Sequence, residues 1–150
     1  MQDNNDKLIV KRYSGIAAVD AVVNGLINKY GLKDNEFFWT GNIVNSCKIE
    51  VYDLCVLISN LISNAVEACI SDGLEKSIEV SILSVGDSFS AVVKNPTKLS
   101  NGVLPDFKTR KEDKRNHGYG IKNMKDTLKK YGGELSFKNE NNKISAIVVA

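Results

Sequence analysis

The sequence predicts an α+β fold, a two-layer α/β sandwich in which about three helices cover one face of a mixed sheet. Two observations lead to this prediction. The chain has 150 residues, of which 43% are hydrophobic and 25% charged, as expected of one globular domain with a single core. Its hydrophobic periods follow the order helix, strand, helix, hairpin, loop, helix, hairpin. We therefore expect residues 1–150 to form a single domain.

Two helices and a strand are expected in the first half of the chain. Apolar residues recur at a helical period from residue 16 to residue 30, and Gly31 follows as a terminator. Residues 36–44 are rich in aromatic and β-branched side chains, which predicts a strand with a bend. Residues 51–70 have the strongest helical period, and a Ser-Asp-Gly sequence closes it.

Alternating apolar residues predict two hairpins in the second half of the chain. A third helix, from Ile121 to Tyr131, separates the hairpins and is ended by two glycines. Residues 95–116 contain both prolines of the chain, many charges and little periodicity, which predicts a long loop. Loops of this length in a compact domain are usually functional, so this one is a candidate lid. The expected strands are 77–85, 89–94, 134–138 and 143–149.

Composition argues against several classes of protein. The formal charge is only +2, so no global field favours nucleic acid or an anionic membrane. The apolar runs are short and the amino terminus is polar, so we expect neither direct membrane insertion nor a secretory signal. The three cysteines lack metal-binding spacing and are interpreted as reduced, buried, cytosolic thiols. The single histidine, His117, argues against mechanisms that need a histidine pair.

Four oxygen-bearing side chains share one border of the predicted helix 51–70. On a wheel of about 100° per residue, Asp53, Asn60, Asn64 and Glu67 fall within roughly 60° of one another, beside the apolar stripe. Asparagine is a poor helix former, so two of them one turn apart call for a reason. Amide oxygens can ligate a hard cation, and amide groups can bond phosphate. A solvated helix edge explains the same pattern and is by itself the more common explanation.

A second motif, His117-Gly118-Tyr119-Gly120-Ile121, stands at the junction of the long loop and the third helix. Glycines at this place allow backbone N–H groups to approach a phosphate where the helix dipole is positive. A Gly-x-Gly sequence alone is weak evidence, because glycine also ends loops. The chain has no GxxxxGK[ST] sequence, which argues against the P-loop class.

These motifs, in this order, resemble the GHKL superfamily, which joins gyrase, the ninety-kilodalton heat-shock chaperones, mismatch-repair ATPases and sensor histidine kinases. Residues 57–65 resemble the N box of the kinases, residues 118–121 the second glycine box, and residues 131–135 the exit of the following helix. The resemblance covers nearly the whole chain and implies a Bergerat-type ATP-binding fold. It implies that Asn64 coordinates Mg²⁺ bridging the phosphates of ATP, and that residues 95–116 form the ATP lid.

One position separates the kinases from the ATPases of this superfamily. The ATP-hydrolysing members resemble one another in a glutamate one turn before the magnesium asparagine, where it acts as base for the attacking water. The present chain has Asn60 at this position. An amide has no useful basicity near neutral pH, which favours phosphoryl transfer to an external acceptor over hydrolysis.

The chain departs from the common kinase pattern at two positions. The first glycine box, with an aspartate that reads the adenine amine, is absent, and we expect the amide oxygen of Asn95 to substitute for it. Glu67 stands where many histidine kinases have a basic phosphate contact, and we include it, with Asn60, among the expected nucleotide-binding residues. Its Asn-Ala-x-Glu-Ala context resembles the peptide-sensing kinases typified by the accessory-gene-regulator quorum sensor. Asp53 is interpreted as structural.

Further nucleotide contacts are expected from the loop and the helix that follows it. Thr109-Arg110-Lys111 resembles a Thr-x-Lys element of the lid, which makes Lys111 the candidate for a γ-phosphate contact. The motif of residues 117–121 completes the expected nucleotide site. His117 is expected to cap or touch phosphate there. It is not assigned as phosphoacceptor, because in the family that histidine lies on a separate, upstream dimerisation helix.

The resemblance implies the catalytic and ATP-binding domain of a sensor histidine kinase. We expect ATP and Mg²⁺ as cofactors, the phosphoacceptor dimerisation domain of the same kinase as partner, and a response regulator as indirect partner. Nucleic acid is not expected to bind. The domain is expected to be cytoplasmic, within a parent protein anchored in the bacterial inner membrane. Alternatives are a nucleotide-gated protein-interaction module or a weak ATPase without phosphotransfer.

Overall fold

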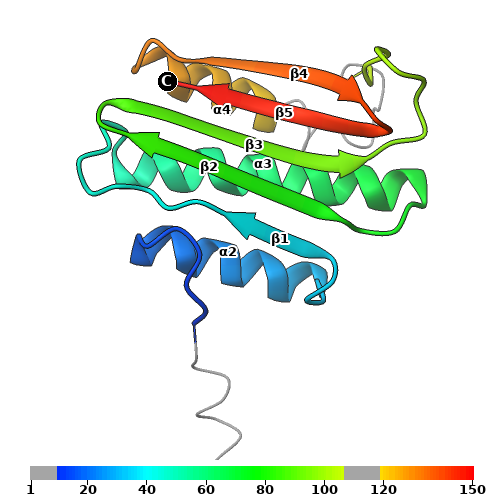
Figure 1. Ribbon diagram of the computed structural model, residues 1–150, viewed down its shortest axis with the longest axis horizontal. Coiled ribbons are helices and arrows are strands. Elements are labelled where there is room, and N and C mark those ends of the chain that lie inside the picture. The colour runs from blue at the N-terminus through cyan, green and yellow to red at the C-terminus, as the bar shows by residue number, and fades with distance from the viewer. Residues whose placement is uncertain (1–9, 107–118) are drawn as a thin grey trace, which may run out of the picture.

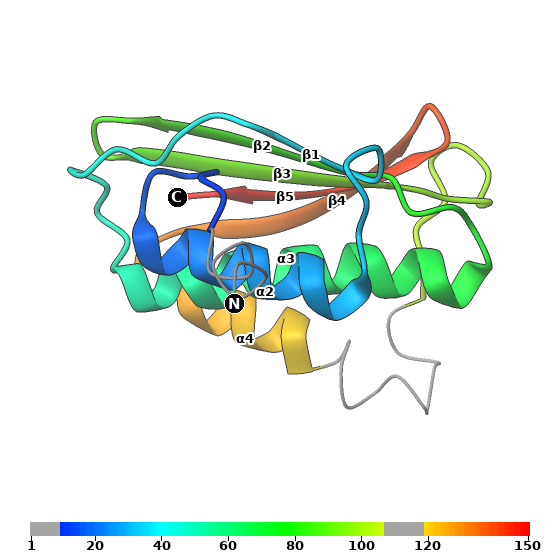
Figure 2. The ribbon, with the colours of Figure 1, turned by 90° about the horizontal axis from the view of Figure 1, so that it is seen from below.

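The computed structural model of the chain describes residues 10–106 and 119–150. Within these ranges the chain forms two layers, a five-stranded sheet and a set of helices on one of its faces (Figure 2). The helices are α2 (Ala17–Tyr30), α3 (Val51–Asp72) and α4 (Tyr119–Lys129). This arrangement confirms the predicted α+β sandwich.

The sheet has the strand order β1-β2-β3-β5-β4 (Figure 1). β1 pairs with β2 in parallel, whereas the other neighbours are antiparallel, so the sheet is mixed as predicted. The two predicted hairpins are present as β2–β3 and β4–β5. The strand bounds are Phe37–Thr40 for β1, Ile78–Val85 for β2, Ser88–Pro96 for β3, Glu134–Glu140 for β4 and Lys143–Val149 for β5.

The turn residues explain why these hairpins form. Gly86, in the β2–β3 turn, has a φ of 55°, a value that glycine adopts without steric penalty. Asn141 and Asn142 join β4 to β5 with φ values of 54° and 61°. Two successive positive φ angles match the right-handed twist of a hairpin, and asparagine tolerates them better than other side chains. The Asn-rich segment of the sequence therefore encodes a tight turn.

Two element boundaries differ from the sequence-based expectation. The first strand ends at Thr40 instead of continuing to residue 44, because Gly41 turns the chain with a φ of 94°. A Cβ on Gly41 would lie 1.9 Å from the carbonyl oxygen of Ile82, so only glycine fits this approach. At the other boundary, β3 continues through Pro96, so the expected loop 95–116 begins after this strand. Asn95 is therefore held in the sheet by pairing with β5.

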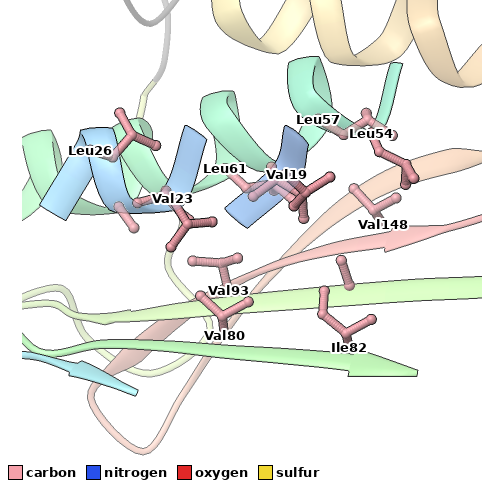
Figure 3. Packing of buried hydrophobic residues seen from close by; sticks show 14 of the residues in the cluster. Val19, Val23, Leu26, Leu54, Leu57, Leu61, Val80, Ile82, Val93 and Val148 are labelled. Carbon is pink, nitrogen blue, oxygen red and sulfur yellow. The ribbon is translucent and has the colours of Figure 1, made fainter. Parts of the chain in front are cut away.

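The hydrophobic core lies between α3 and the sheet (Figure 3). Leu54, Leu57 and Leu61 of α3 are almost fully buried and face Val93 and Val148 of the sheet. Each fully buried side chain of this size contributes roughly 2 kcal/mol relative to an exposed one. The predicted apolar stripe of this helix is thus confirmed as the core face.

By length and composition alone, α3 would pass as a membrane-crossing helix, but its apolar stripe is covered by the sheet. It ends at Gly73, which adopts the left-handed conformation and donates its N–H to the last turn. The cysteines are free thiols, of which Cys69 is buried, whereas Cys47 and Cys55 are only half-buried. The expectation that all three are buried is therefore wrong for two of them.

Candidate functional site

A cavity of about 240 Å³ lies between α3 and the strands β3, β4 and β5. Its wall is largely apolar, with Leu61 and Ala65 on the helix side and Phe137 and Ile144 on the sheet side. Polar groups reach it at few places, the pattern of a small-molecule site whose apolar wall encloses the ligand and whose few polar groups orient it. The polar members of the wall are Asn64, Asp72, Asn95, Thr97 and Asp106.

The two helical asparagines have different environments. Asn64 lines the cavity and is half-buried, with no hydrogen bond to its side chain in the described part of the chain. Asn60 lies one turn earlier, and its Nδ2 donates to the carbonyl oxygen of Val56 at 2.8 Å. This bond to the preceding turn explains how α3 accommodates an asparagine, and it fixes the orientation of the amide. The amide oxygen of Asn60 is then presented away from its own helix.

Gly120 contacts both asparagines from the first turn of α4. A Cβ built on this glycine would lie 3.0 Å from Oδ1 of Asn60 and 3.5 Å from Oδ1 of Asn64. The close approach of α4 to α3 therefore depends on the missing side chain. Ile121, the next residue, packs against the core. The structure thus brings together the asparagine and glycine motifs that the sequence predicts to form one site.

Part of the predicted glycine and lid motifs cannot be placed. Lys111, His117 and Gly118 lie outside the described residues. Tyr119 begins α4, but only its backbone is described. These four assignments remain predictions.

Asn95 reaches the cavity from the end of β3. Only 7% of its surface is exposed, and its Nδ2 donates to the carbonyl oxygen of Pro96 at 3.0 Å. That bond leaves the amide oxygen as the group available to a ligand. Thr97, the next residue but one, is also buried and lines the cavity. The predicted role of Asn95 as a hydrogen-bond acceptor is therefore compatible with its position.

Glu67 shares its wheel position with Asn60 but has different neighbours. Its Oε1 accepts a hydrogen bond from the hydroxyl of Tyr30, the last residue of α2, at 3.1 Å. Burial, with a smaller contribution from Glu67, raises the pKa of this hydroxyl, although a bond to Ser63 opposes the shift. Glu67 is not part of the cavity wall. The structure therefore does not bring it together with Asn64 at the cavity.

Asp53 anchors the far end of α4. It is 3% exposed, accepts a hydrogen bond from the hydroxyl of Tyr131, and lies 3.2 Å from Nζ of Lys130. The Tyr131 hydroxyl, followed by Lys130, holds the pKa of Asp53 below its usual value. The same Tyr131 hydroxyl accepts a bond from the backbone N–H of Glu50 at 3.1 Å. The structural interpretation of Asp53 fits this network, which fixes α4 against the start of α3.

Much of the cavity wall was not predicted as a site. Ile144 and Ala146 point inward by the alternation of β5, a signal that is present in the sequence. By contrast, Leu99, Pro105 and Asp106 belong to the segment 95–116, which the sequence predicts as a lid, but this segment has no periodicity that indicates which of its residues line the cavity. Among the described residues, no group of three or more His, Cys, Asp or Glu could hold a metal ion.

Comparisons with solved structures show the same fold. The nucleotide-free catalytic domain of histidine kinase ThkA is 17% identical, with a TM-score of 0.59 over 89% of each chain. The mycobacterial sensor histidine kinase MprB is 14% identical, with a TM-score of 0.59 over 89% of this chain and 91% of that one. Histidine kinase AdeS of Acinetobacter baumannii is 12% identical, with a TM-score of 0.56 over 97% of this chain and 70% of that one.

Sequence comparison gives the family directly. A search of curated proteins found no match. A family model described as the GHKL domain matches residues 49–149, which include α3, the cavity strands and α4. Since this range is more than half of the 150 residues, the chain belongs to the GHKL domain family.

Proposed function

We propose that this GHKL domain binds Mg-ATP in the cavity and transfers the γ-phosphoryl group to a histidine on a separate dimerisation domain. The observation that carries the proposal is the contact of Gly120 with Asn60 and Asn64. This contact brings together the segments that resemble the N box and the second glycine box, at the edge of an apolar cavity. The fold shared with histidine kinase catalytic domains supports the proposal.

The apolar part of the cavity is proposed to hold the adenine base. Leu61 and Ala65 line the cavity on the helix side, and Phe137 and Ile144 line it on the sheet side. Burying a base between such side chains is favourable because apolar surface leaves water on both sides. The amide oxygen of Asn95 is proposed to accept a hydrogen bond from the 6-amino group. Because Nδ2 of Asn95 is engaged with Pro96, its amide presents an acceptor, as an aspartate would.

The phosphates are proposed to lie between Asn64 and the amino-terminal turn of α4. Mg²⁺ usually binds through one or two protein oxygens together with substrate phosphates, and the half-buried amide of Asn64 at the cavity edge suits this mode. When bound, the ion neutralises charge that develops on the phosphoryl group. Gly120 lets the backbone of α4 come close, where the helix dipole favours an anion. Lys111, His117, Gly118, Tyr119 and Ile121 are proposed as further nucleotide contacts.

Asn60 supports phosphotransfer over hydrolysis. It occupies the position of the catalytic base in hydrolysing relatives, and its Nδ2 is bonded to the helix backbone. Its amide cannot accept a proton from water near neutral pH. The domain would then position ATP for in-line attack by a histidine supplied from outside.

The parent protein is proposed to be a cytoplasmic-facing sensor kinase anchored in the bacterial inner membrane, which signals through a response regulator. The Asn-Ala-x-Glu-Ala sequence around Glu67 supports a place in the peptide-sensing, quorum-sensing branch. Within this branch, Glu67 remains proposed as a nucleotide-site residue. Because Glu67 is bonded to Tyr30 at the end of α2, we propose that it influences the nucleotide site through the position of that helix.

Titration of the chain with ATP, in the presence of magnesium or of a chelator, tests the site. Wild type is expected to bind more tightly with magnesium, and Asn64→Ala to lose that difference together with at least tenfold in affinity, or about 1.4 kcal/mol. Asn123→Ala is the matched control, since this asparagine is exposed on α4 and has no side-chain hydrogen bond in the described structure. Unchanged affinity and metal dependence in Asn64→Ala would refute the assignment.

A second experiment separates a kinase from a nucleotide-gated interaction module or a weak ATPase. The chain is supplied with the upstream helical region of its parent and with ATP. If the domain transfers phosphate to a histidine, the upstream region should carry a phosphoryl group that is labile in acid and stable in base, as expected of phosphohistidine. Binding of ATP without such a product would favour the interaction module, and rapid release of phosphate would favour the ATPase.

A further inference from the structure

Asn139 lies beside the nucleotide cavity without being part of its wall. The pairing of the strands places Asn95, Ile144 and Asn139 in one row across β3, β5 and β4, on the face covered by helices. Asn95 and Ile144 line the cavity. Asn139, at the end of the row, is only 4% exposed. A buried amide at this place needs hydrogen-bond partners.

Those partners are backbone groups of the segment that closes the cavity. Nδ2 of Asn139 donates to the carbonyl oxygens of Ser100 at 2.8 Å and Val103 at 2.6 Å. Its own backbone carbonyl accepts the N–H of Gly102 at 3.1 Å. The turn is closed internally by the N–H of Val103, which donates to Ser100 at 2.9 Å. One residue of β4 therefore holds a turn at both of its ends.

This turn connects two pieces of the cavity wall. Leu99 precedes it, Pro105 and Asp106 follow it, and all three line the cavity. The turn itself, residues 100–103, is exposed. If its bonds to Asn139 were lost, its carbonyls would be hydrated and the turn would move, with little effect on the core. The position of the wall thus depends on Asn139 more than the stability of the fold does.

The remaining atom of the amide supports this interpretation. Oδ1 of Asn139 is buried and has no hydrogen-bond partner among the described residues. An unpaired buried acceptor is unfavourable and offsets part of what the two donated bonds contribute. The net contribution of Asn139 to folding is then small, whereas its directional effect on the turn remains.

We infer that Asn139 is a positioning residue of the nucleotide site, which holds the 100–103 turn so that Leu99 and Pro105 close on the base. The inference rests on the proposed function, because it requires a nucleotide in the cavity. Since Asn139 acts at the end of the cavity near Asn95, it affects the base and not the phosphates. Adenosine and ADP should therefore be weakened by the same factor when Asn139 is changed.

Titrations of the full chain with ADP and with adenosine test this role in Asn139→Ala. Both affinities are expected to fall about tenfold, with a melting temperature within a few degrees of wild type. Asn101→Ala is the matched control, because Asn101 is exposed in the same turn and has no side-chain bond in the described structure. It should bind both ligands as wild type does. Asn139→Asp, which keeps the shape but removes both donated hydrogens, should weaken them as Asn139→Ala does.

The outcomes distinguish the inference from the proposed function. If wild type binds neither ligand, the proposed function fails. If wild type binds and both Asn139 variants bind within twofold of it, only the role of Asn139 is overturned. Loss of folding in both variants would also overturn it, because Asn139 would then be a residue of the core. Weakening of ADP without weakening of adenosine would place its effect at the phosphates and contradict the inference.

Discussion

Replacing Gly120 by alanine tests the contact on which the proposed site depends. The new methyl group would lie 3.0 Å from Oδ1 of Asn60, closer than ordinary van der Waals contact, and 3.5 Å from Oδ1 of Asn64. Asn60 cannot yield freely, because its Nδ2 is bonded to Val56 at 2.8 Å. Breaking that bond costs about 1 kcal/mol. Alanine in place of glycine in a helix raises the free energy of unfolding by up to about 1 kcal/mol.

The two effects nearly cancel, so the free energy of unfolding of Gly120→Ala should lie within about 1 kcal/mol of wild type. Binding should respond differently, because the methyl group fills the space through which the backbone of α4 approaches the phosphates. We expect the affinity for Mg-ATP to fall at least tenfold, or about 1.4 kcal/mol. Urea unfolding and calorimetric titration measure the two quantities on the same protein.

Gly25→Ala is the control for helix propensity. Gly25 lies in α2, away from the cavity, and a Cβ there would have no atom within 4 Å. This variant should gain up to about 1 kcal/mol of stability and bind ATP as wild type does. Unchanged ATP affinity in Gly120→Ala would refute the reasoning. A loss of stability well beyond 1 kcal/mol would show that the contact serves the fold.

Three further predictions follow from single contacts. Asp53→Ala should lower the free energy of unfolding by about 2 kcal/mol, since it removes a hydrogen bond from Tyr131 to a charged group. Because the folded pKa of Asp53 lies below the usual 3.8, its contribution to stability should be complete above that pH and be lost as the pH falls further. Urea unfolding between about pH 2 and 6 would show this loss as a fall in the free energy of unfolding at the acid end. Asn95→Ala should lower the affinity for ATP severalfold and leave the affinity for inorganic triphosphate unchanged. An equal loss of affinity for both ligands would contradict a contact between Asn95 and the base. With Asn60 in place, steady-state phosphate release by the chain alone should be slow, and robust turnover would contradict its assigned role.

Most of the fold could be read from hydrophobic period and turn chemistry. The stripe of α3 was visible because apolar residues recur every third or fourth position, and Asn141 and Asn142 marked a hairpin because few other residues adopt positive φ. The end of β1 at Thr40 was not visible. It depends on how closely Gly41 approaches Ile82, a contact between segments far apart in sequence.

The sequence by itself determined the α+β layers and the asparagine and glycine motifs, because these depend on local periodicity and on residue chemistry. Only the tertiary structure decided which motif residues meet. On a wheel Asn60 and Glu67 coincide, but seven residues at about 1.5 Å each separate them by roughly 10 Å along the axis. Asn60 therefore lies against Gly120 of α4, whereas Glu67 lies against Tyr30 of α2. A helical period fixes the face of a side chain, and the packing of neighbouring helices fixes its partner.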